Sequence, residues 1–303
     1  MAKIVIALGG NALGNDLKEQ ESALTHSADI IASLIQQGHD VLITHGNGPQ
    51  VGKIHQVMNT QLDIPLYVSV AMSQGYIGFD LTRKLQHALT KHGVNVPVDY
   101  VLTMVEVDPN DPAFTNPTKP IGGFMDEVTA AGLVKEGVPV VEDSGRGYRR
   151  VVASPKPKHI TNLTSIQDAL NQHHVVVCAG GGGIPVISTD QGYVGVEAVI
   201  DKDSASALLA KELDVDVLFI LTAVEKVAVY YGTPKQQWLS SMSVEETKQY
   251  IQEGHFAPGS MLPKVEAALS FVSQAKDKTT IITLLDKASE ALKGETGTRI
   301  VSD

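Results

Sequence analysis

Hydrophobic residues along this chain alternate between two patterns, short continuous apolar runs and longer stretches with helical spacing. The runs at residues 3–8, 41–44 and 175–179 are rich in β-branched side chains, which is typical of strands buried on both faces. Residues 21–38 carry apolar side chains at helical spacing and stop at a glycine. Because a strand precedes this helix and another follows it at once, the region has the order of a parallel βαβ unit.

The same alternation continues over the rest of the chain. Ser243 and Glu246 have the spacing of a capping box, and Pro263 suits the first position of a helix. Together the patterns predict helices over residues 73–92, 126–137, 204–213, 243–254 and from 263 onwards, and strands over residues 98–105, 217–222, 280–285 and 298–301. We therefore predict an α/β fold with helices on both faces of the sheet.

Residues 108–157 break this alternation. The stretch is rich in proline, glycine and charge, and it holds one short helical pattern. It is either a disordered linker or a small excursion folded over the active face. Its interspersed aromatic and β-branched residues favour the ordered insertion. We expect one domain over residues 1–303, with residues 108–157 as an inserted subdomain.

The composition is that of an acidic globular protein. The formal net charge of -10 argues against nucleic acid or an anionic membrane as the main partner, because both need a clustered basic face. No apolar run approaches membrane-spanning length, and no charged leader with an apolar segment opens the chain, so we expect a cytoplasmic protein. The single cysteine, Cys178, lies in an apolar strand and predicts a core residue rather than an intrachain disulfide.

Three of the predicted strands are followed by glycine-containing loops, at residues 9–11, 45–48 and 180–183. We expect these three loops to gather at one edge of the sheet. In an open parallel sheet, ligands bind at the carboxyl ends of the strands. Glycine lets the backbone come close to a ligand, and clustered N–H groups form concavities that hold anions. The loops therefore predict a phosphate ligand, and more than one phosphate.

Two common phosphate-binding motifs are absent. The segment from Gly46 to Lys53 comes close to a Walker A loop, but five residues separate Gly46 from Gly52 and Ile54 follows the lysine. No strand is followed by the Gly-x-Gly-x-x-Gly pattern of a dinucleotide site. A phosphate site in this chain must rest on another architecture.

Three lysines are candidates for the cationic part of that site. Lys202 lies between Asp201 and Asp203 at a predicted helix start, where the carboxylates keep its ammonium charged; the alternative is a solvated helix start with Asp203 as N-cap. Lys264 lies in the first turn of a helix, where a cation is disfavoured unless it shares an anion with the helix end. Lys119 is held between two prolines. Each of the last two has a solvated surface lysine as its alternative.

Seven segments resemble the carbamate kinase family, in order and from end to end of the chain. They are ALGGNAL (residues 7–13), THGNGPQVG (44–52), AMSQG (71–75), NPTKPIG (116–122), GGGGIPV (180–186), EAVIDKD (197–203) and FAPGSMLPK (256–264). Carbamate kinases belong to the amino acid kinase superfamily. The resemblance therefore implies an open, mainly parallel sheet between helix layers, a protruding lid at residues 108–157 and a homodimer.

The resemblance also assigns site residues. Those implied to hold the small substrate and the phosphoryl group in transfer are Gly9, Gly10, Asn11, Gly46 and Asn47. The catalytic residues it implies are Lys202 and Lys264, which neutralise the phosphoryl group, Asp203, which orients them, and Lys119, which reaches in from the lid. The implied ATP-binding residues are Gly10, Lys202, Thr222, Ala223, Val224, Met261 and Lys264.

The family reaction is reversible phosphoryl transfer between ATP and carbamate, giving ADP and carbamoyl phosphate, and it runs towards ATP in many fermenting organisms. Carbamate is already an oxyanion and needs no general base, so His45 and His255 are interpreted as structural. Magnesium would bind through the nucleotide phosphates, with no metal site on the protein. The resemblance associates such an enzyme with arginine breakdown, although agmatine- or purine-derived routes would use the same chemistry.

Two other functions remain as alternatives. One is a different enzyme of the superfamily that phosphorylates a small carboxylate. The other is a catalytically silent nucleotide-binding paralogue. Retention of Lys202, Lys264, Asn11 and Asn47 speaks against the silent paralogue, because loss of a cation is the simplest route to inactivity.

Overall fold

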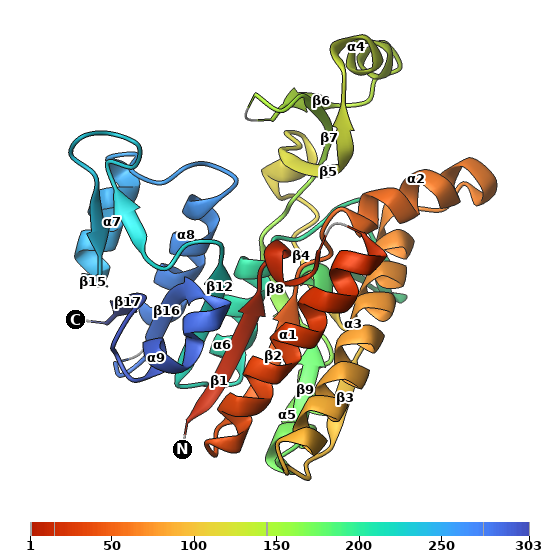
Figure 1. Cartoon of the computed structure of the whole chain (residues 1–303). Coiled ribbons are helices and arrows are strands. Elements are labelled where there is room, and N and C mark those ends of the chain that lie inside the picture. The colour runs from red at the N-terminus through yellow and green to blue at the C-terminus, as the bar shows by residue number, and fades with distance from the viewer. Residues whose placement is uncertain (1, 15, 144, 275, 303) are drawn as a thin grey trace.

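A computed structural model describes residues 2–14, 16–143, 145–274 and 276–302, and its centre is an eight-stranded sheet (Figure 1). The strand order is β15-β17-β16-β12-β1-β2-β9-β3. The strands are β1 (Lys3–Leu8), β2 (Asp40–His45), β3 (Val98–Val101), β9 (Val175–Cys178), β12 (Val217–Thr222), β15 (Ser241–Ser243), β16 (Thr279–Leu284) and β17 (Thr298–Val301). β16 and β17 pair antiparallel, whereas the other neighbouring strands pair parallel. The predicted open, mainly parallel sheet is confirmed.

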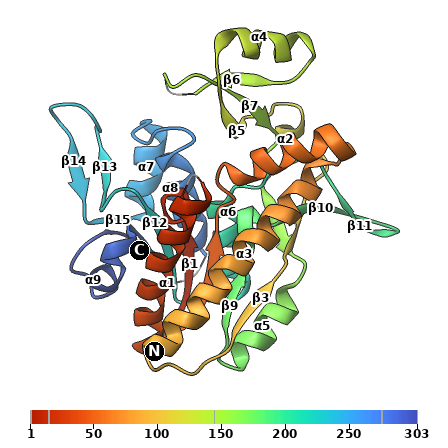
Figure 2. The same ribbon diagram turned by 45° about the vertical axis from the view of Figure 1, so that its right-hand side comes forward.

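Helices cover both faces of this sheet, as predicted. One layer contains α1 (Leu17–Gln36), α3 (Leu66–Lys91) and α9 (Ala288–Leu292), and the other contains α5 (Leu163–Asn171), α6 (Lys202–Glu212), α7 (Val244–Gln252) and α8 (Met261–Val272). Figure 2 shows α1 and α3 side by side on the near face. Along β1, Val5 packs into the α6–α8 layer while Ile4 and Ile6 pack into the α1–α3 layer. This alternation of side chains explains why the strands are continuous apolar runs.

A second sheet of four strands lies beside the first, in the order β11-β10-β4-β8. Its strands are β4 (Met104–Val107), β8 (Pro157–Ile160), β10 (Ile184–Thr189) and β11 (Gly192–Gly195). The prediction of a single strand over residues 98–105 is wrong, because this run divides into β3 and β4 of different sheets. The break falls at Thr103, whose backbone N–H donates to Oε1 of Gln74 at 2.6 Å instead of joining a strand ladder.

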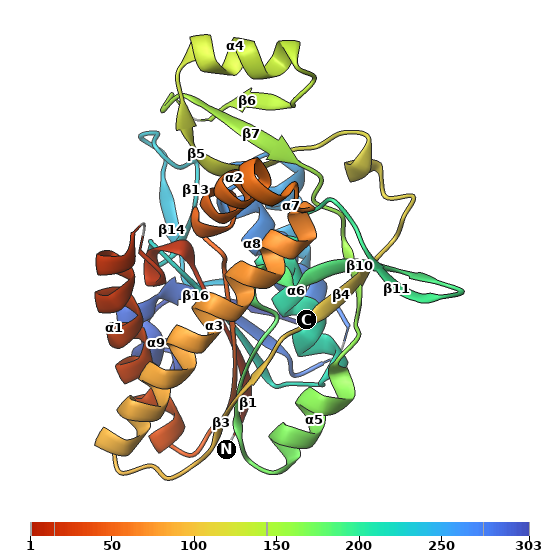
Figure 3. The same cartoon turned by 90° about the vertical axis from the view of Figure 1, so that its right-hand side faces the viewer.

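The stretch that breaks the alternation in the sequence carries a small unit of its own. Its sheet has the order β5-β7-β6. The elements are β5 (Lys119–Met125), α4 (Glu127–Lys135), β6 (Val140–Glu142) and β7 (Tyr148–Val152), and we call residues 119–152 the protruding unit. It projects beyond one end of the central sheet (Figures 1 and 3). The chain leaves for it after β4, through the short η2 (Pro112–Phe114), and returns through β8, which pairs antiparallel with β4.

Several helix ends differ from the predictions. α2 (Gln50–Leu62) was not predicted, because most of its residues are exposed and it buries only Gln50, Val51, Gly52 and His55. α8 begins at Met261, so Pro263 is its third residue rather than its first. The capping box of Ser243 and Glu246 is confirmed at the start of α7. The hairpin of β13 (Val227–Val229) and β14 (Gln237–Leu239) was also missed.

Over the described residues, no helix combines the length and apolarity needed to cross a membrane.

Candidate active site

The glycine-containing loops follow three neighbouring strands of the central sheet. β1, β2 and β9 lie side by side and run parallel, so their carboxyl ends meet at one edge. η1 (Gly10–Ala12) follows β1, residues 46–49 follow β2, and η3 (Gly180–Gly182) follows β9. The prediction that these loops gather at one edge of the sheet is confirmed.

The glycine run of η3 packs directly against the loop after β2. Gly181 has a φ of +66°, and a Cβ there would lie 2.8 Å from Nδ2 of Asn47. A Cβ on Gly180 would lie 2.3 Å from Nε2 of His45. Glycine leaves room for this approach and adopts the left-handed conformation without a steric cost. The η3 loop therefore packs directly on the side chains of His45 and Asn47.

Gln74, on α3, holds the η3 loop in place. Its Nε2 donates to the carbonyl oxygen of Gly180 at 2.9 Å, while its Oε1 accepts from the backbone of Thr103. The side chain is fully buried. No role was predicted for Gln74, because its partners lie 29 and 106 positions away along the chain.

Two predicted catalytic lysines meet on one carboxylate. Nζ of Lys202 donates to Oδ1 of Asp203, and Nζ of Lys264 donates to Oδ2 at 3.0 Å. Asp203 is 2% exposed, so the two ammonium groups are held by a buried anion. Burial lowers the pKa of Lys202, Asp203 opposes that shift, and the charge of Lys264 adds to it. Two cations share one anion, and the surplus positive charge suits this place to a phosphate.

The aspartate on the other side of Lys202 caps the helix. Oδ1 of Asp201 accepts from the backbone N–H groups of Asp203 and Ser204, at 2.9 and 3.3 Å. The alternative in which Asp203 is the N-cap of a solvated helix start is therefore wrong. Oδ2 of Asp201 accepts from Nζ of Lys119 at 2.5 Å. Lys119, the third predicted lysine, thus reaches the start of α6, although it lies 82 positions before Asp201 in the chain.

His45 is fully buried at the end of β2. Burial lowers its pKa to about 4, the hydrogen bond to Gly46 opposes the shift, and the charge of Lys202 adds to it. Its Nδ1 lies 2.7 Å from the carbonyl oxygen of Gly46, so Nδ1 carries the hydrogen in the neutral ring. At neutral pH this ring is uncharged.

Comparison with known proteins identifies the family. Residues 2–283 match the model of the amino acid kinase family. The chain belongs to the amino acid kinase family. It is 52% identical to the carbamate kinase-like protein YqeA of Escherichia coli (strain K12), with 98% of each chain covered. It is 48% identical to carbamate kinase of Clostridium perfringens, with 99% of each chain covered.

A solved structure agrees with this assignment. Carbamate kinase from Giardia lamblia bound to AMP-PNP superposes on the chain with a TM-score of 0.90 at 39% identity. The match covers 100% of this chain and 99% of that one. The family resemblance described from the sequence is confirmed, and so is the fold class that it implied.

In this amino acid kinase, two hydroxyl groups fix the start of α6 against β2. Oγ of Ser206 donates its one hydrogen to the carbonyl oxygen of Lys202 at 2.6 Å. Oγ1 of Thr44 lies 2.6 Å from the same Oγ and is therefore the donor in that second hydrogen bond. Both side chains are fully buried. They were missed in the sequence, where a threonine at a strand end and a serine in a helix are unremarkable.

The remaining predicted residues lie around this edge. The backbone N–H of Gly46 donates to the carbonyl oxygen of Leu8 at 3.3 Å. Nδ2 of Asn47 is buried and has no hydrogen-bond partner within the described part of the chain. Asn11 belongs to η1, but its side chain lies outside the described part of the structure. Val224 is partly buried beyond β12, and Met261 is the first residue of α8.

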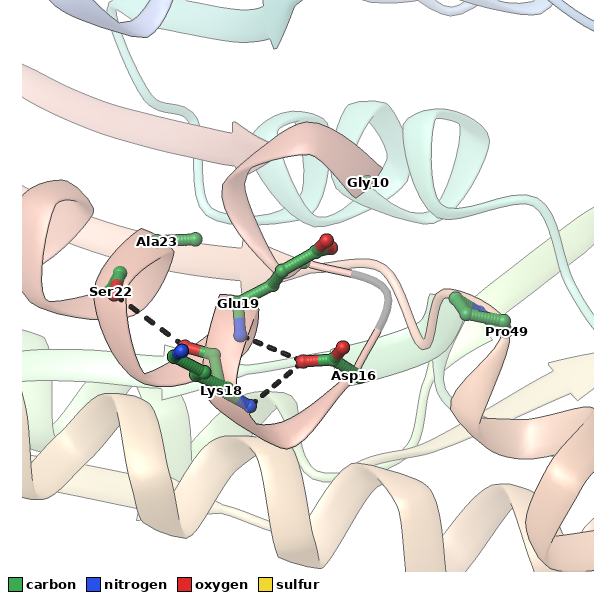
Figure 4. Close-up of a pocket in the computed structure, with 8 residues that line it drawn as sticks. Gly10, Asp16, Lys18, Glu19, Ser22, Ala23 and Pro49 are labelled. Atoms are coloured by element: carbon green, nitrogen blue, oxygen red, sulfur yellow. Dashed lines mark hydrogen bonds between the residues drawn. The ribbon is translucent and has the colours of Figure 1, made fainter.

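Two cavities adjoin these loops. The smaller, of about 230 Å³, is lined by Gly9, Thr222 and Ala223 together with residues 284–286. The larger, of about 920 Å³, opens between Gly10, Pro49 and the first turn of α1 (Figure 4). The carboxylate of Asp16 already caps α1 there, through the backbone N–H groups of residues 18 and 19. Among the described residues, no group of three or more His, Cys, Asp or Glu side chains is placed to hold a metal ion.

Proposed function

We propose that this protein is a carbamate kinase. It transfers a phosphoryl group reversibly between ATP and carbamate, giving ADP and carbamoyl phosphate, and it works in the cytoplasm towards ATP synthesis. Relatives that carry the name carbamate kinase are 48% identical over nearly their whole length. The single observation that carries the proposal is the buried Asp203, which holds Lys202 and Lys264 together beside the glycine-containing loops.

Phosphoryl transfer demands positioning and charge stabilisation more than covalent chemistry. Negative charge spreads over the equatorial oxygens of the phosphoryl group, while the entering and leaving oxygens stay roughly in line. Lys202 and Lys264 are fixed in advance by Asp203, so they stabilise this charge without reorganising during the reaction. Gly9, Gly10, Asn11, Gly46 and Asn47 hold carbamate and the phosphoryl group by backbone and amide donors.

Carbamate brings its own nucleophilic oxyanion, so the site needs no general base. The neutral, fully buried ring of His45 suits this chemistry, since it contributes packing rather than proton transfer. His255 lies against the rings of Tyr230 and Tyr250, with centroids 4.3 and 5.5 Å away, as a structural residue does.

The nucleotide is bound as its magnesium complex at the β12 side of the site. The Giardia lamblia carbamate kinase was solved with AMP-PNP, an analogue of ATP. Thr222, Ala223, Val224 and Met261 contact the nucleoside, and Gly10, Lys202 and Lys264 contact the phosphates. Magnesium is held by the nucleotide phosphates, because the carboxylates of Asp201 and Asp203 are already engaged by lysines.

Three further features belong to this proposal. Residues 1–303 form one kinase domain, in which the insertion 108–157 serves as a lid that carries Lys119. The protein is a homodimer that serves arginine breakdown. Met72 and Phe79, which are 40% and 65% exposed on α3, offer apolar surface of the kind that subunits bury. Sedimentation equilibrium tests the dimer.

The test of the proposal is ATP synthesis from carbamoyl phosphate and MgADP, measured with a luciferase-coupled assay. We expect ATP well above a protein-free blank, and acetyl phosphate at the same concentration to support a much lower rate. A higher rate with acetyl phosphate would favour the small-carboxylate kinase. Calorimetric ADP binding without any ATP formation would favour the silent paralogue.

A further inference from the structure

Asp201 joins two parts of the molecule that the central sheet does not join. We propose that Asp201 is a positioning residue that holds the protruding unit on the active site by fixing the ammonium group of Lys119. The expected effect of Asp201 on catalysis rests on the proposed function. The expected effect of Asp201 on the placement of the protruding unit rests on geometry alone.

The two oxygens of this carboxylate have separate partners. Oδ1 accepts from the backbone N–H groups of Asp203 and Ser204 and so caps α6, the helix that begins with Lys202. Oδ2 accepts from Nζ of Lys119 at 2.5 Å. One side chain therefore fixes both the helix end that carries two catalytic groups and the first residue of β5.

The pair is partly shielded from water and lies at the base of the protruding unit. The side chains of Lys119 and Asp201 are 32% and 20% exposed. Lys119 pairs in register with Val152 at the end of β7. The next residue, Ala153, forms a parallel bridge with Ala198, three positions before Asp201. Two strands of the unit, β5 and β7, thus reach the segment that contains Asp201.

A second contact holds the unit from the other side. Gly52 of α2 lies so close to β5 that a Cβ there would stand 2.2 Å from Cα of Gly122. Nη2 of Arg149 donates to the carbonyl oxygen of Gly122 at 3.0 Å, which stiffens this part of the unit. The backbone contact between Gly52 and Gly122 fixes the distance between α2 and β5. The ion pair with Asp201 fixes the direction of the Lys119 side chain. Asp201 is therefore the residue that decides where this ammonium points.

The charges around Asp201 require such a partner. Lys119, Lys202 and Lys264 bring three ammonium groups to a site with two carboxylates, Asp201 and Asp203. Burial opposes ionisation of Asp201, but the charges and hydrogen bonds of Lys119 and the charge of Lys202 outweigh it, so its pKa lies below the usual range. The ionised carboxylate therefore holds Lys119 until an anionic substrate competes for this ammonium group.

The substitution Asp201→Asn separates the two roles. Asparagine caps helices as well as aspartate does, so the start of α6 is kept. The amide has no charge with which to hold Lys119. We expect Asp201→Asn to lower kcat at least tenfold and to leave the Kd of ADP within twofold. The double variant Asp201→Asn/Lys119→Ala should be no slower than Lys119→Ala alone, because both changes break the same contact.

Hydrogen exchange of the ligand-free protein gives a readout that needs no activity. Asp201→Asn and Lys119→Met should each speed amide exchange in β5 and β7, and the double variant Asp201→Asn/Lys119→Met should add nothing. Asp126→Asn is the matched control, because it makes the same carboxylate-to-amide change at the N-cap of α4 within the same unit. It should leave exchange in β5 and β7 as in the parent.

The outcomes are distinct. Multiplicative losses of kcat, or unchanged exchange in both single variants, overturn the proposal. If Asp201→Asn does not fold, Lys119→Met tests the same contact through its other partner. Unchanged exchange in Lys119→Met would then overturn the proposal by itself. A parent protein that makes no ATP contradicts the proposed function. Non-additive exchange among its variants would still support the contact between Asp201 and the protruding unit.

Discussion

Nζ of Lys264 lies 3.0 Å from Oδ2 of Asp203, although the two residues are 61 positions apart in the chain. Asp203 takes Lys202 on its other oxygen. A single buried carboxylate therefore sets the separation of two ammonium groups before any substrate arrives.

Replacing Lys202 by alanine removes a preorganised charge from the phosphoryl group in transfer. We expect Lys202→Ala to lower kcat a hundredfold or more, which corresponds to about 3 kcal/mol of transition-state stabilisation. Steady-state ATP synthesis from carbamoyl phosphate and MgADP measures it. Lys91→Ala, at the far end of α3 with a 65% exposed side chain, is the control and should retain the parent rate. A folded Lys202→Ala protein with near-normal kcat would contradict the assignment.

Replacing Asp203 by alanine leaves two ammonium groups unpaired in a buried place. Breaking such a pair by removing one partner costs about 3 kcal/mol or more, so Asp203→Ala should lower the free energy of unfolding by that order. Urea unfolding followed by circular dichroism measures this loss. Asp190→Ala, an exposed position beyond β10, should change stability by no more than about 0.5 kcal/mol. Equal stability of the two variants would show that Lys202 and Lys264 do not depend on Asp203.

Replacing Gly181 by alanine tests the contact between η3 and the loop after β2. The left-handed backbone there costs a residue with a Cβ about 1–2 kcal/mol, and the Cβ also displaces Nδ2 of Asn47. We expect Gly181→Ala to lower both the unfolding free energy and the affinity for carbamoyl phosphate. At Gly75, inside α3, an added Cβ meets nothing within 4 Å among the described residues. Gly75→Ala should stabilise the protein by about 0.5–1 kcal/mol, and the opposite ranking would refute the contact.

Local patterns explain how much of the fold was predictable. Buried parallel strands are continuous apolar runs and their loops contain glycine, so β1, β2, β9 and β12 and the edge that they form were visible in the sequence. The division of β3 from β4 was not, because it depends on a hydrogen bond between Thr103 and Gln74, 29 positions apart. α2 was missed since a helix that buries only a few residues has no apolar stripe.

The site divides in the same way. Lys202 and Lys264 stand out at helix starts, where a cation is disfavoured. The role of Asp203 was implied only by the family resemblance, and the structure brings the three residues together. The contact of Asp201 with Lys119 joins positions 82 residues apart and has no local signature. Family resemblance pointed to Lys119 as a residue of the site, but it gave no partner for its ammonium group.

The buried ring of His45 makes the stability of the protein depend on pH. Its pKa falls from the ordinary value of 6.5 to about 4 on folding, because burial disfavours the charged ring. Above pH 6.5 the ring is neutral in both states and contributes no pH dependence. As pH falls from 6.5 towards 4, the unfolded chain takes up a proton that the folded protein refuses, so stability is lost with decreasing pH.

Between pH 6.5 and 4.5 this single group should lower the free energy of unfolding by about 2 kcal/mol. Urea unfolding at a series of pH values measures the loss. His45→Asn keeps a donor towards the carbonyl oxygen of Gly46 but does not titrate, so its stability should fall less over this interval than that of the parent. His87→Asn, at an exposed position on α3, is the matched control and should follow the parent. Parallel curves for the parent and His45→Asn would mean that the ring is not held neutral by its burial at the end of β2.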